Sequence, residues 1–465
     1  MNSTQHNWNP PSGPTRRTIL KAAAGFGGAA AAAMALSACG SGSSSSAAKP
    51  KTGKATLTNV EHDTRPLDRA AYAAVYQAFR AKNPDIELKF TEIPWEQARS
   101  KMLTLGQGNS LPNVGRMAWP ADYAAAGMVL PLDDRVKPEV LARYDQMAID
   151  QYSTQGDDGK VHLFGLPWFA GATAVMVNKT MLDKAGVKLG ATWTTAEFQD
   201  ICKAVTQTGK QWGVTLDGNG IGDPVQIFLM AVYAYGGKWV AGDTKSTTPE
   251  PLVFDSPETV EGIKWYLNLY KSGVAVPSAP SDTYQQRDAN FIAGKAAIAW
   301  QGPWNITATQ ATFKKNGFDL VSMPLPTGPA GNTSVYGGGA AGIFKSSQKQ
   351  GVVDQAFTWI DFLGSDEGEK LYCKANGMIP ASKAARSDAY WSANPLYQGY
   401  LKAMESTPLM FPVWATGLES LLDTIVPPLL QGAFNGQVSE QDMAKKIQEQ
   451  VVKGLQKNGV KTANS

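Results

Sequence analysis

The sequence predicts an α/β fold arranged in two lobes. Near its start, strand and helix patterns alternate: the expected strands are Ala55–Val60, Ile86–Phe90 and Pro112–Met117, and the helices between them are Pro66–Ala81 and Pro94–Leu105. A βαβαβ order favours a parallel sheet with right-handed crossovers. About 410 residues follow from the first strand onward, which exceeds one ordinary hydrophobic core, so two lobes are expected.

The rest of the chain continues this alternation and then ends in helices. The expected strands are Gly165–Trp168 and Ala172–Asn178 as a pair, Trp212–Leu216, Ala296–Trp300, Phe318–Pro324 and Val335–Phe344. The expected helices are Ala121–Ala126, Lys179–Ala185, Thr194–Thr206, Asp223–Tyr235, one opening at Ser256, Asp282–Ala293, Val352–Leu363, Asp366–Ala375, Pro395–Met404, Leu418–Ile425 and Glu440–Leu455. Pro427 and Pro428 should end or kink the helix that begins at Leu418, because proline has no N–H to donate.

One stretch, Phe291–Asn305, combines several turn signals around a short apolar strand. Gly294 suits the residue after a helix, and Pro303 suits the first turn of the next helix. This arrangement presents Trp300 and Trp304, with free backbone N–H groups, at the end of a strand, where ligands bind in open α/β sheets. The alternative is a core strand with two buried tryptophans.

The N-terminus has the pattern of an export signal. Thr15–Lys21 (TRRTILK) is a twin-arginine pattern, and a short Ala/Gly-rich apolar run leads to Leu36–Gly40 (LSACG), which resembles a bacterial lipobox. The prediction is therefore a signal peptide over residues 1–38, a lipid on Cys39 and a flexible Ser/Gly-rich tether over residues 39–51. The alternative is a chance cysteine after a plain signal peptide.

The charge balance excludes an obvious nucleic-acid surface. The whole chain has a net charge of +3, but removing the three basic residues before Cys39 leaves 40 Lys and Arg against 40 Asp and Glu. No basic patch interleaved with aromatic residues stands out.

Cysteine and histidine usage does not indicate a metal site or a cofactor, and none is expected. Cys202 and Cys373 either form a disulfide in an oxidising compartment or remain buried free thiols. The three histidines are scattered rather than clustered at ligand spacing. Asp217, Asn219 and Asp223 resemble part of a calcium loop, but Phe228 stands where the distal glutamate would be.

Five stretches in order resemble the extracellular solute-binding proteins of ABC importers, in the sugar- and oligosaccharide-binding branch that includes maltodextrin-binding protein. They are Trp119–Asp133, Gly165–Trp168 followed by Met176–Lys179, Tyr235–Gly237, Phe291–Trp304 and Asn376–Pro380. Each stretch is weak alone, because Gly, Pro and Trp mark turns in any protein. Their order behind a lipobox makes a strong joint signal.

The resemblance implies a periplasmic-binding-protein-like fold: two α/β lobes, a hinge and an interlobe cleft that closes on a mono- or oligosaccharide. The implied lobe 1 holds residues 52–171 and 322–350, and the implied lobe 2 holds residues 172–321 and 351–465. The implied protein is a monomeric carrier and not an enzyme. It would be lipid-anchored outside the cell membrane and would deliver sugar to an ABC permease.

A sugar site needs aromatic planes for C–H faces and polar groups for hydroxyls. The candidates at strand ends and helix starts are Trp95, Trp119, Trp168, Tyr235 with Gly236, Trp300, Gly302, Trp304 and Trp414, with Gly338 and Gly339 allowing close backbone approach. For any single aromatic residue, core packing is the alternative, and for the glycines it is a bulge in a strand.

Polar candidates gather in the loop that follows the first strand. They are His62, Asp63 and Arg65, in a segment more charged than in many relatives, together with Glu92, Asp122 and Asp223. Asp122 follows Trp119 by one helical turn, so both can face the cleft. A helix cap is the favoured role for Asp223.

Two other classes of function remain open. A lipid-anchored glycoside hydrolase would need two facing carboxylates, which a sequence cannot show. A binding protein for a peptide, a polyamine or iron is the second alternative. No GxSxG, HExxH or P-loop motif is present in the sequence.

Overall fold

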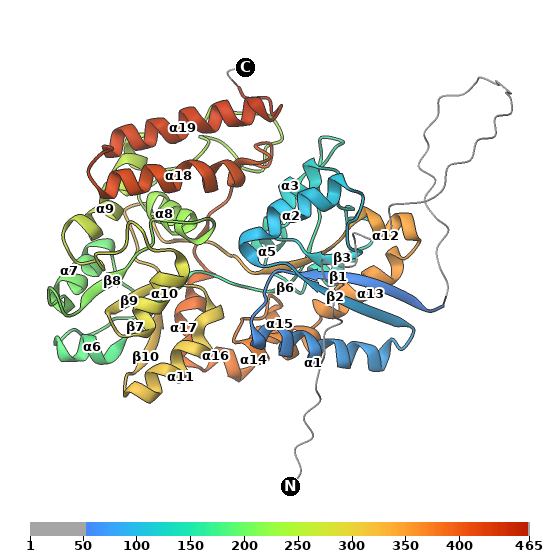
Figure 1. Cartoon of the computed structure of the whole chain (residues 1–465), viewed down its shortest axis with the longest axis horizontal. Helices are drawn as coiled ribbons and strands as arrows, with labels where there is room; N and C mark the ends of the chain where they lie inside the picture. The colour runs from blue at the N-terminus through green and yellow to red at the C-terminus, as the bar shows by residue number, and fades with distance from the viewer. Residues whose placement is uncertain (1–52, 464–465) are drawn as a thin grey trace, which may run out of the picture. The chain divides into compact units, whose positions relative to one another are not determined.

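The computed structural model describes residues 53–463, which form two main β-sheets, two small two-stranded sheets and the helices that cover them (Figure 1). The predicted signal peptide, the tether and the predicted lipidation site Cys39 lie outside the described residues. Within residues 53–463, none of the helices combines the length and the apolar character needed to cross a membrane.

The first sheet has five strands in the order β2-β1-β3-β12-β6. Their bounds are β1 (Ala55–Glu61), β2 (Ile86–Glu92), β3 (Val114–Arg116), β6 (Leu166–Phe169) and β12 (Gly339–Ile343). β1 runs parallel to β2 and β3, which confirms the predicted βαβαβ unit. β12 returns from much later in the chain and pairs antiparallel with both β3 and β6.

Helices on both faces of this sheet complete lobe 1, with α2 and α3 above it and α1 below it in Figure 1. They are α1 (Pro66–Lys82), α2 (Trp95–Gln107), α3 (Pro120–Ala125), α4 (Pro138–Leu141), α5 (Gln146–Gln151), α12 (Lys345–Gln350), α13 (Val353–Leu363), α14 (Asp366–Asn376), α15 (Lys383–Arg386) and α16 (Ala389–Ser392). A two-stranded sheet of β4 (Ser153–Gln155) and β5 (Val161–Leu163) lies beside them.

The second sheet has four strands in the order β10-β7-β9-β8. Their bounds are β7 (Ala174–Asn178), β8 (Trp212–Thr215), β9 (Ala296–Gln301) and β10 (Leu320–Met323). The predicted pairing of the two strands around Gly171 is wrong: β6 pairs with β12 in the first sheet and β7 pairs with β9 and β10 in the second. Both strands are fully buried, so their apolar patterns do not reveal that the chain changes sheet between them.

The helices of lobe 2 surround this second sheet. They are α6 (Lys179–Lys184), α7 (Thr195–Val205), α8 (Asp223–Ala234), α9 (Pro257–Lys271), α10 (Tyr284–Ile292), the 3₁₀ turn η1 (Pro303–Asn305), α11 (Ile306–Asn316), α17 (Pro395–Ala403), α18 (Leu418–Phe434) and α19 (Glu440–Lys457). A short parallel pair, β11 (Thr333–Ser334) with β13 (Thr407–Pro408), completes the fold.

The sequence led us to expect all residues after 350 in lobe 2. The contacts of α13 and α14 differ from this expectation. Trp359 of α13 donates a hydrogen bond from Nε1 to Asn59 of β1 (3.0 Å), and Tyr372 of α14 lies 4.9 Å from Tyr72 of α1, ring centre to ring centre. These contacts place α13 and α14 in lobe 1. The chain returns to lobe 2 only at α17, where Gly399 packs directly on the backbone of β10.

The prediction that Pro427 and Pro428 end or kink the helix begun at Leu418 is wrong about its end: α18 continues to Phe434 with both prolines inside. Two missing N–H groups cost the helix hydrogen bonds to the carbonyls four residues earlier. Pro428 is exposed, and so is Thr424, whose freed carbonyl can bond water. Burial of the helix's apolar side against α19 offsets the remaining cost.

The two cysteines are free thiols in different places. Cys202 is buried in α7, against the backbone of Gly213 in lobe 2, and Cys373 is buried in α14 beside Trp168 in lobe 1. Of the two alternatives left by the sequence, the structure therefore shows buried free thiols.

Candidate functional site

The stretch Phe291–Asn305 folds as its turn signals predict. Gly294 follows α10 in the left-handed region with φ 72°, β9 is buried along its whole length, and Pro303 opens η1. Trp300 is only 2% exposed, whereas Trp304 is half-buried. The two tryptophans therefore differ: Trp300 is mainly a core residue, and Trp304 remains accessible at the strand end.

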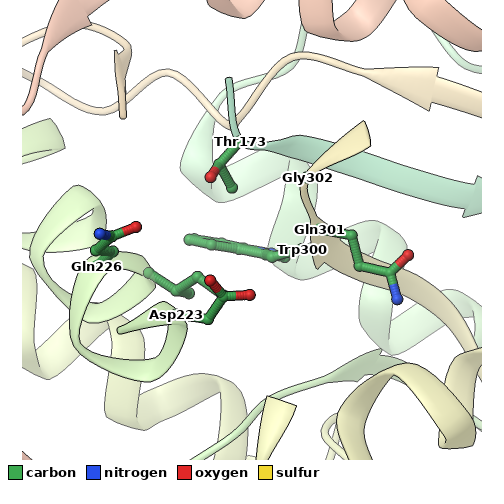
Figure 2. Close-up of a pocket in the computed structure, with 7 residues that line it drawn as sticks. Thr173, Asp223, Gln226, Trp300, Gln301 and Gly302 are labelled. Carbon is green, nitrogen blue, oxygen red and sulfur yellow. The ribbon is translucent and has the colours of Figure 1, made fainter. Parts of the chain in front are cut away.

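A small pocket opens at this end of β9 (Figure 2). It has no room for a water-sized molecule in this conformation, and it is lined by Thr173, Asp223, Gln226, Ile227, Trp300, Gln301 and Gly302. In Figure 2 the Trp300 ring lies between Thr173 and Asp223. Ligand pockets usually measure roughly 300–1,000 Å³. A sugar therefore fits here only if the surrounding walls move apart.

Gly302 is required by the ring of Trp304. A Cβ added to Gly302 would lie 1.8 Å from Cζ3 of Trp304, so the indole must fold back over the glycine. We expect Gly302→Ala to displace the ring and to lower stability by about 1–3 kcal/mol, the usual cost of overpacking. Denaturant unfolding checks the stability loss, and an unchanged unfolding midpoint would contradict the close packing.

The lobe 1 side of the site is an aromatic and cationic surface formed by Trp95, Trp119 and Arg116, which we call the Trp95 wall. The rings of Trp95 and Trp119 lie 4.8 Å apart, and the Arg116 guanidinium sits 5.1 Å from the Trp95 ring centre. Asp63 forms an ion pair with Arg116, and His62 packs 6.0 Å from Trp119. Trp95 is half-buried and Trp119 is almost fully buried, so Trp95 carries the accessible face.

Two titratable side chains behind this wall are neutral near pH 7. Burial raises the pKa of Glu61 to about 8, although its hydrogen bonds with Tyr72 and Asn59 oppose the shift. Burial also lowers the pKa of His62 to about 4, and the positive charge of Arg116 lowers it further. The charged pair in this region is therefore Arg116 with Asp63.

A buried arginine organises the lobe 2 side. Arg287 of α10 is fully buried and bonds three carboxylates: Asp217 at 3.0 Å, Asp223 at 3.2 Å and Asp288 at 2.9 Å. Asp288 also accepts a hydrogen bond from Gln301 at 2.6 Å, which ties the network to the pocket strand. Burial raises the pKa of Asp217 to about 7, against the attraction of Arg287.

The predicted capping role of Asp223 is wrong. Gly222 occupies the N-cap of α8, and Asp223 lies in the first turn with its carboxylate on Arg287 and on the pocket. This aspartate therefore belongs to the site.

Polar side chains join the two lobes at several points. Arg65 donates from Nη1 to the backbone carbonyl of Trp304 at 2.6 Å. Glu96 of α2 accepts hydrogen bonds from Tyr284 (3.0 Å) and Gln285 (2.7 Å) of α10. A Cβ added to Gly222 would lie 3.6 Å from Nε1 of Trp95, so the start of α8 reaches the Trp95 wall.

Other predicted site residues lie away from the pocket. Trp168 is fully buried among lobe 1 aromatics, and Trp414 is 3% exposed in the lobe 2 core. Tyr235 donates to Thr195 at 3.2 Å at the far end of α8, next to Gly236. Their turn-rich sequence contexts reflect packing in the two cores.

The glycine pair at the start of β12, Gly338 and Gly339, packs closely against β6. Gly338 has φ 109°, and a Cβ there would lie 2.2 Å from the Phe169 carbonyl. Its own carbonyl accepts from Arg116 at 3.2 Å, while Gly339 lies against the Phe169 ring. Glu92 forms an exposed ion pair with Arg69 at 2.6 Å.

The sequence-based prediction missed most charged partners in this region, above all Arg99, Arg116 and Arg287. Arg99 follows Trp95 by four residues on α2, so helical spacing could have placed it on the same face. It pairs with Asp122 at 2.5 Å, which compensates the charge of that predicted site residue where its side chain is 12% exposed. No local pattern marks Arg116 or Arg287, because their carboxylate partners other than Asp288 come from distant segments.

The sequence of this two-lobe chain is similar to those of known binding proteins. Residues 63–370 match the family described as bacterial extracellular solute-binding protein. The maltotriose-binding protein of Pyrococcus abyssi is 24% identical over 410 residues, which cover 85% of this chain and 82% of that protein. The diacetylchitobiose binding protein DasA of Streptomyces coelicolor is 26% identical over 350 residues, covering 72% of this chain and 76% of that protein.

Solved structures share the fold. The GacH receptor of Streptomyces glaucescens superposes with a TM-score of 0.72 at 22% identity, covering 87% of this chain and 99% of that chain. Maltose-bound MalE3 of T. maritima superposes with a TM-score of 0.72 at 21% identity, covering 86% and 99%. The family match spans more than half of the sequence, and the chain therefore belongs to the bacterial extracellular solute-binding protein family.

Proposed function

We propose that this chain is the substrate-binding component of an ABC-type carbohydrate importer, and that it captures a mono- or oligosaccharide between its lobes. The proposal rests on one arrangement: the Trp95 wall of lobe 1 meets the start of α8, whose Asp223 and Gln226 line the pocket next to Trp304. Aromatic faces beside carboxylate and amide groups suit the C–H faces and hydroxyls of a sugar. The maltotriose- and diacetylchitobiose-binding relatives support this ligand class.

The proposed carrier acts at the outer face of the cell membrane. Cys39 would carry the lipid, residues 39–51 would tether the folded part, and the loaded monomer would deliver its sugar to the permease. We expect Cys39→Ala to move the protein from the membrane fraction to the soluble fraction after export. A variant that stays in the membrane fraction would contradict the lipid anchor.

A thermal-shift screen tests the ligand class. We expect maltotriose, maltose or diacetylchitobiose to raise the melting temperature, because a ligand at 100 times its Kd stabilises the native state by about 2.7 kcal/mol. Spermidine and a tripeptide serve as controls. If only an amine or a peptide stabilised the protein, the carbohydrate proposal would fail.

The same samples test for catalysis. Chromatography of each sugar after prolonged incubation should return it unchanged. Products of glycosidic cleavage would instead support the glycoside hydrolase alternative.

A further inference from the structure

The lobes meet at a cluster in which one arginine faces three carboxylates. Arg99 of α2 and Asp122 of α3 belong to lobe 1, whereas Glu419 and Asp423 lie one turn apart on α18 of lobe 2. Arg99 pairs with Asp122 at 2.5 Å and with Asp423 at 3.9 Å. These four residues, which we call the Arg99 cluster, carry an excess of negative charge across the interface.

The surroundings add hydrogen bonds but little positive charge. Asp423 accepts from the Gly222 N–H at 2.9 Å, and Gln226 of α8 bonds Glu419. The hydroxyl-bearing residues Tyr123 of α3 and Tyr152, before β4, also face the cluster. The positive charge of Arg116 lowers the pKa of Tyr123 and of Tyr152, although Arg116 forms its own ion pair with Asp63. Within residues 53–463, Arg99 is therefore the cation that forms ion pairs with Asp122 and Asp423.

Closing of the interlobe cleft buries the Arg99 cluster, and this burial costs free energy when every carboxylate is ionised. The side chains of Arg99, Asp122 and Asp423 are only 13%, 12% and 8% exposed. Burial raises the pKa of Asp122 and of Asp423, although Arg99 opposes both shifts. Burial, followed by the charges of Asp423 and Asp122, raises the pKa of Glu419 to about 8. Separating the lobes would admit water and move Glu419 away from Asp122.

We propose that the Arg99 cluster is a pH-sensitive latch: closing of the cleft takes up a proton from solvent onto a cluster carboxylate, chiefly Glu419, so acidification favours the closed form. The proposal rests on the proposed function only in that closing traps the ligand. The proton forms an O–H bond on one carboxyl oxygen and is released when the lobes part.

The direction follows from linkage. A group whose pKa is higher in the closed form than in the open form gives the closed form more bound protons. Below the closed-form pKa, acidification therefore raises the closing equilibrium constant by up to about tenfold per pH unit. This increase is lost as the pH rises through that pKa. The window runs from the ordinary carboxyl range up to about 8 for Glu419.

Small-angle X-ray scattering of the ligand-free protein measures closing directly. We expect the closing equilibrium constant to rise at least tenfold between about pH 9 and about pH 6. Glu419→Gln keeps the side-chain shape and a hydrogen-bonding group but cannot titrate, so it should remain closed at both values. Asp423→Asn, a second variant, should weaken the pH dependence because it removes one repelling charge.

Asp150→Asn is the matched control. It removes another interlobe contact, the Lys245–Asp150 ion pair at 2.5 Å, in which one cation meets one carboxylate. This variant should reduce closing by the same factor at both pH values. Identical scattering of the wild type at both values, or a wild-type pH dependence in Glu419→Gln, would overturn the latch. Since the scattering needs no sugar, a protein that closes in acid but binds no sugar would contradict the proposed function alone.

Discussion

Replacing Arg287 by methionine is expected to lower the free energy of unfolding by about 3–5 kcal/mol, the usual cost of removing one partner from a buried ion network. The change leaves Asp217 and Asp288 buried with no cation between them, while Asp223 loses its tie to α10. Methionine fills much of the space, so the loss reports charge rather than volume. Denaturant unfolding measures it.

Arg69→Met is the matched control for this prediction. Arg69 pairs with Glu92 at 2.6 Å, but its side chain is 55% exposed, and exposed ion pairs contribute little to stability because water and salt screen them. The two variants should therefore differ by several kcal/mol. A loss below about 1 kcal/mol for Arg287→Met would mean that the buried network does not hold lobe 2 together.

Replacing Trp304 by alanine is expected to weaken sugar binding by about 2–3 kcal/mol, or roughly 30- to 150-fold in Kd. The indole is half-buried against Gly302, which is one of the residues that line the pocket, and its free face can cover the C–H face of a sugar ring. Folding should survive, since Arg65 contacts the backbone carbonyl of residue 304. Calorimetric titration with the sugar that stabilises the wild type gives the Kd.

Tyr390→Ala provides the comparison, because Tyr390 is 39% exposed on α16 and its ring packs against Trp391 and Tyr397 rather than against a residue that lines the pocket. Its sugar affinity should match that of the wild type. If Trp304→Ala bound the sugar with unchanged affinity, Trp304 would have only a structural role.

Local rules explain what the sequence predicted well. Gly294 and Pro303 each impose a backbone geometry on their own neighbours, so the helix–strand–turn–helix order around β9 could be derived directly. The helix expected from Thr194 also begins there for a local reason, because Thr194 and Glu197 form a capping box at the start of α7.

Long-range packing explains what could not be predicted. The apolar faces of α13 and α14 show that they are helices, but not that they cover β1 and α1 rather than the second sheet. The continuation of α18 through Pro427 and Pro428 depends on burial against α19, and local helix propensities carry no information about that contact.

The site shows the same division. Trp95 and Trp304 could be proposed because tryptophan beside proline or glycine at an element end is visible in the sequence. Asp288 is the neighbour of Arg287 on α10, but the other two carboxylates of the network come from distant segments, so only the fold reveals it.

A crystal structure of the protein with the sugar that gives the largest thermal shift tests the central claim most directly. We predict the sugar between the Trp95 wall of lobe 1 and the end of β9 in lobe 2. There its ring should lie against Trp95 or Trp304, and its hydroxyls should bond Asp223 or Gln226. A sugar bound outside the interlobe region, or a non-carbohydrate ligand held there by these same residues, would contradict the account.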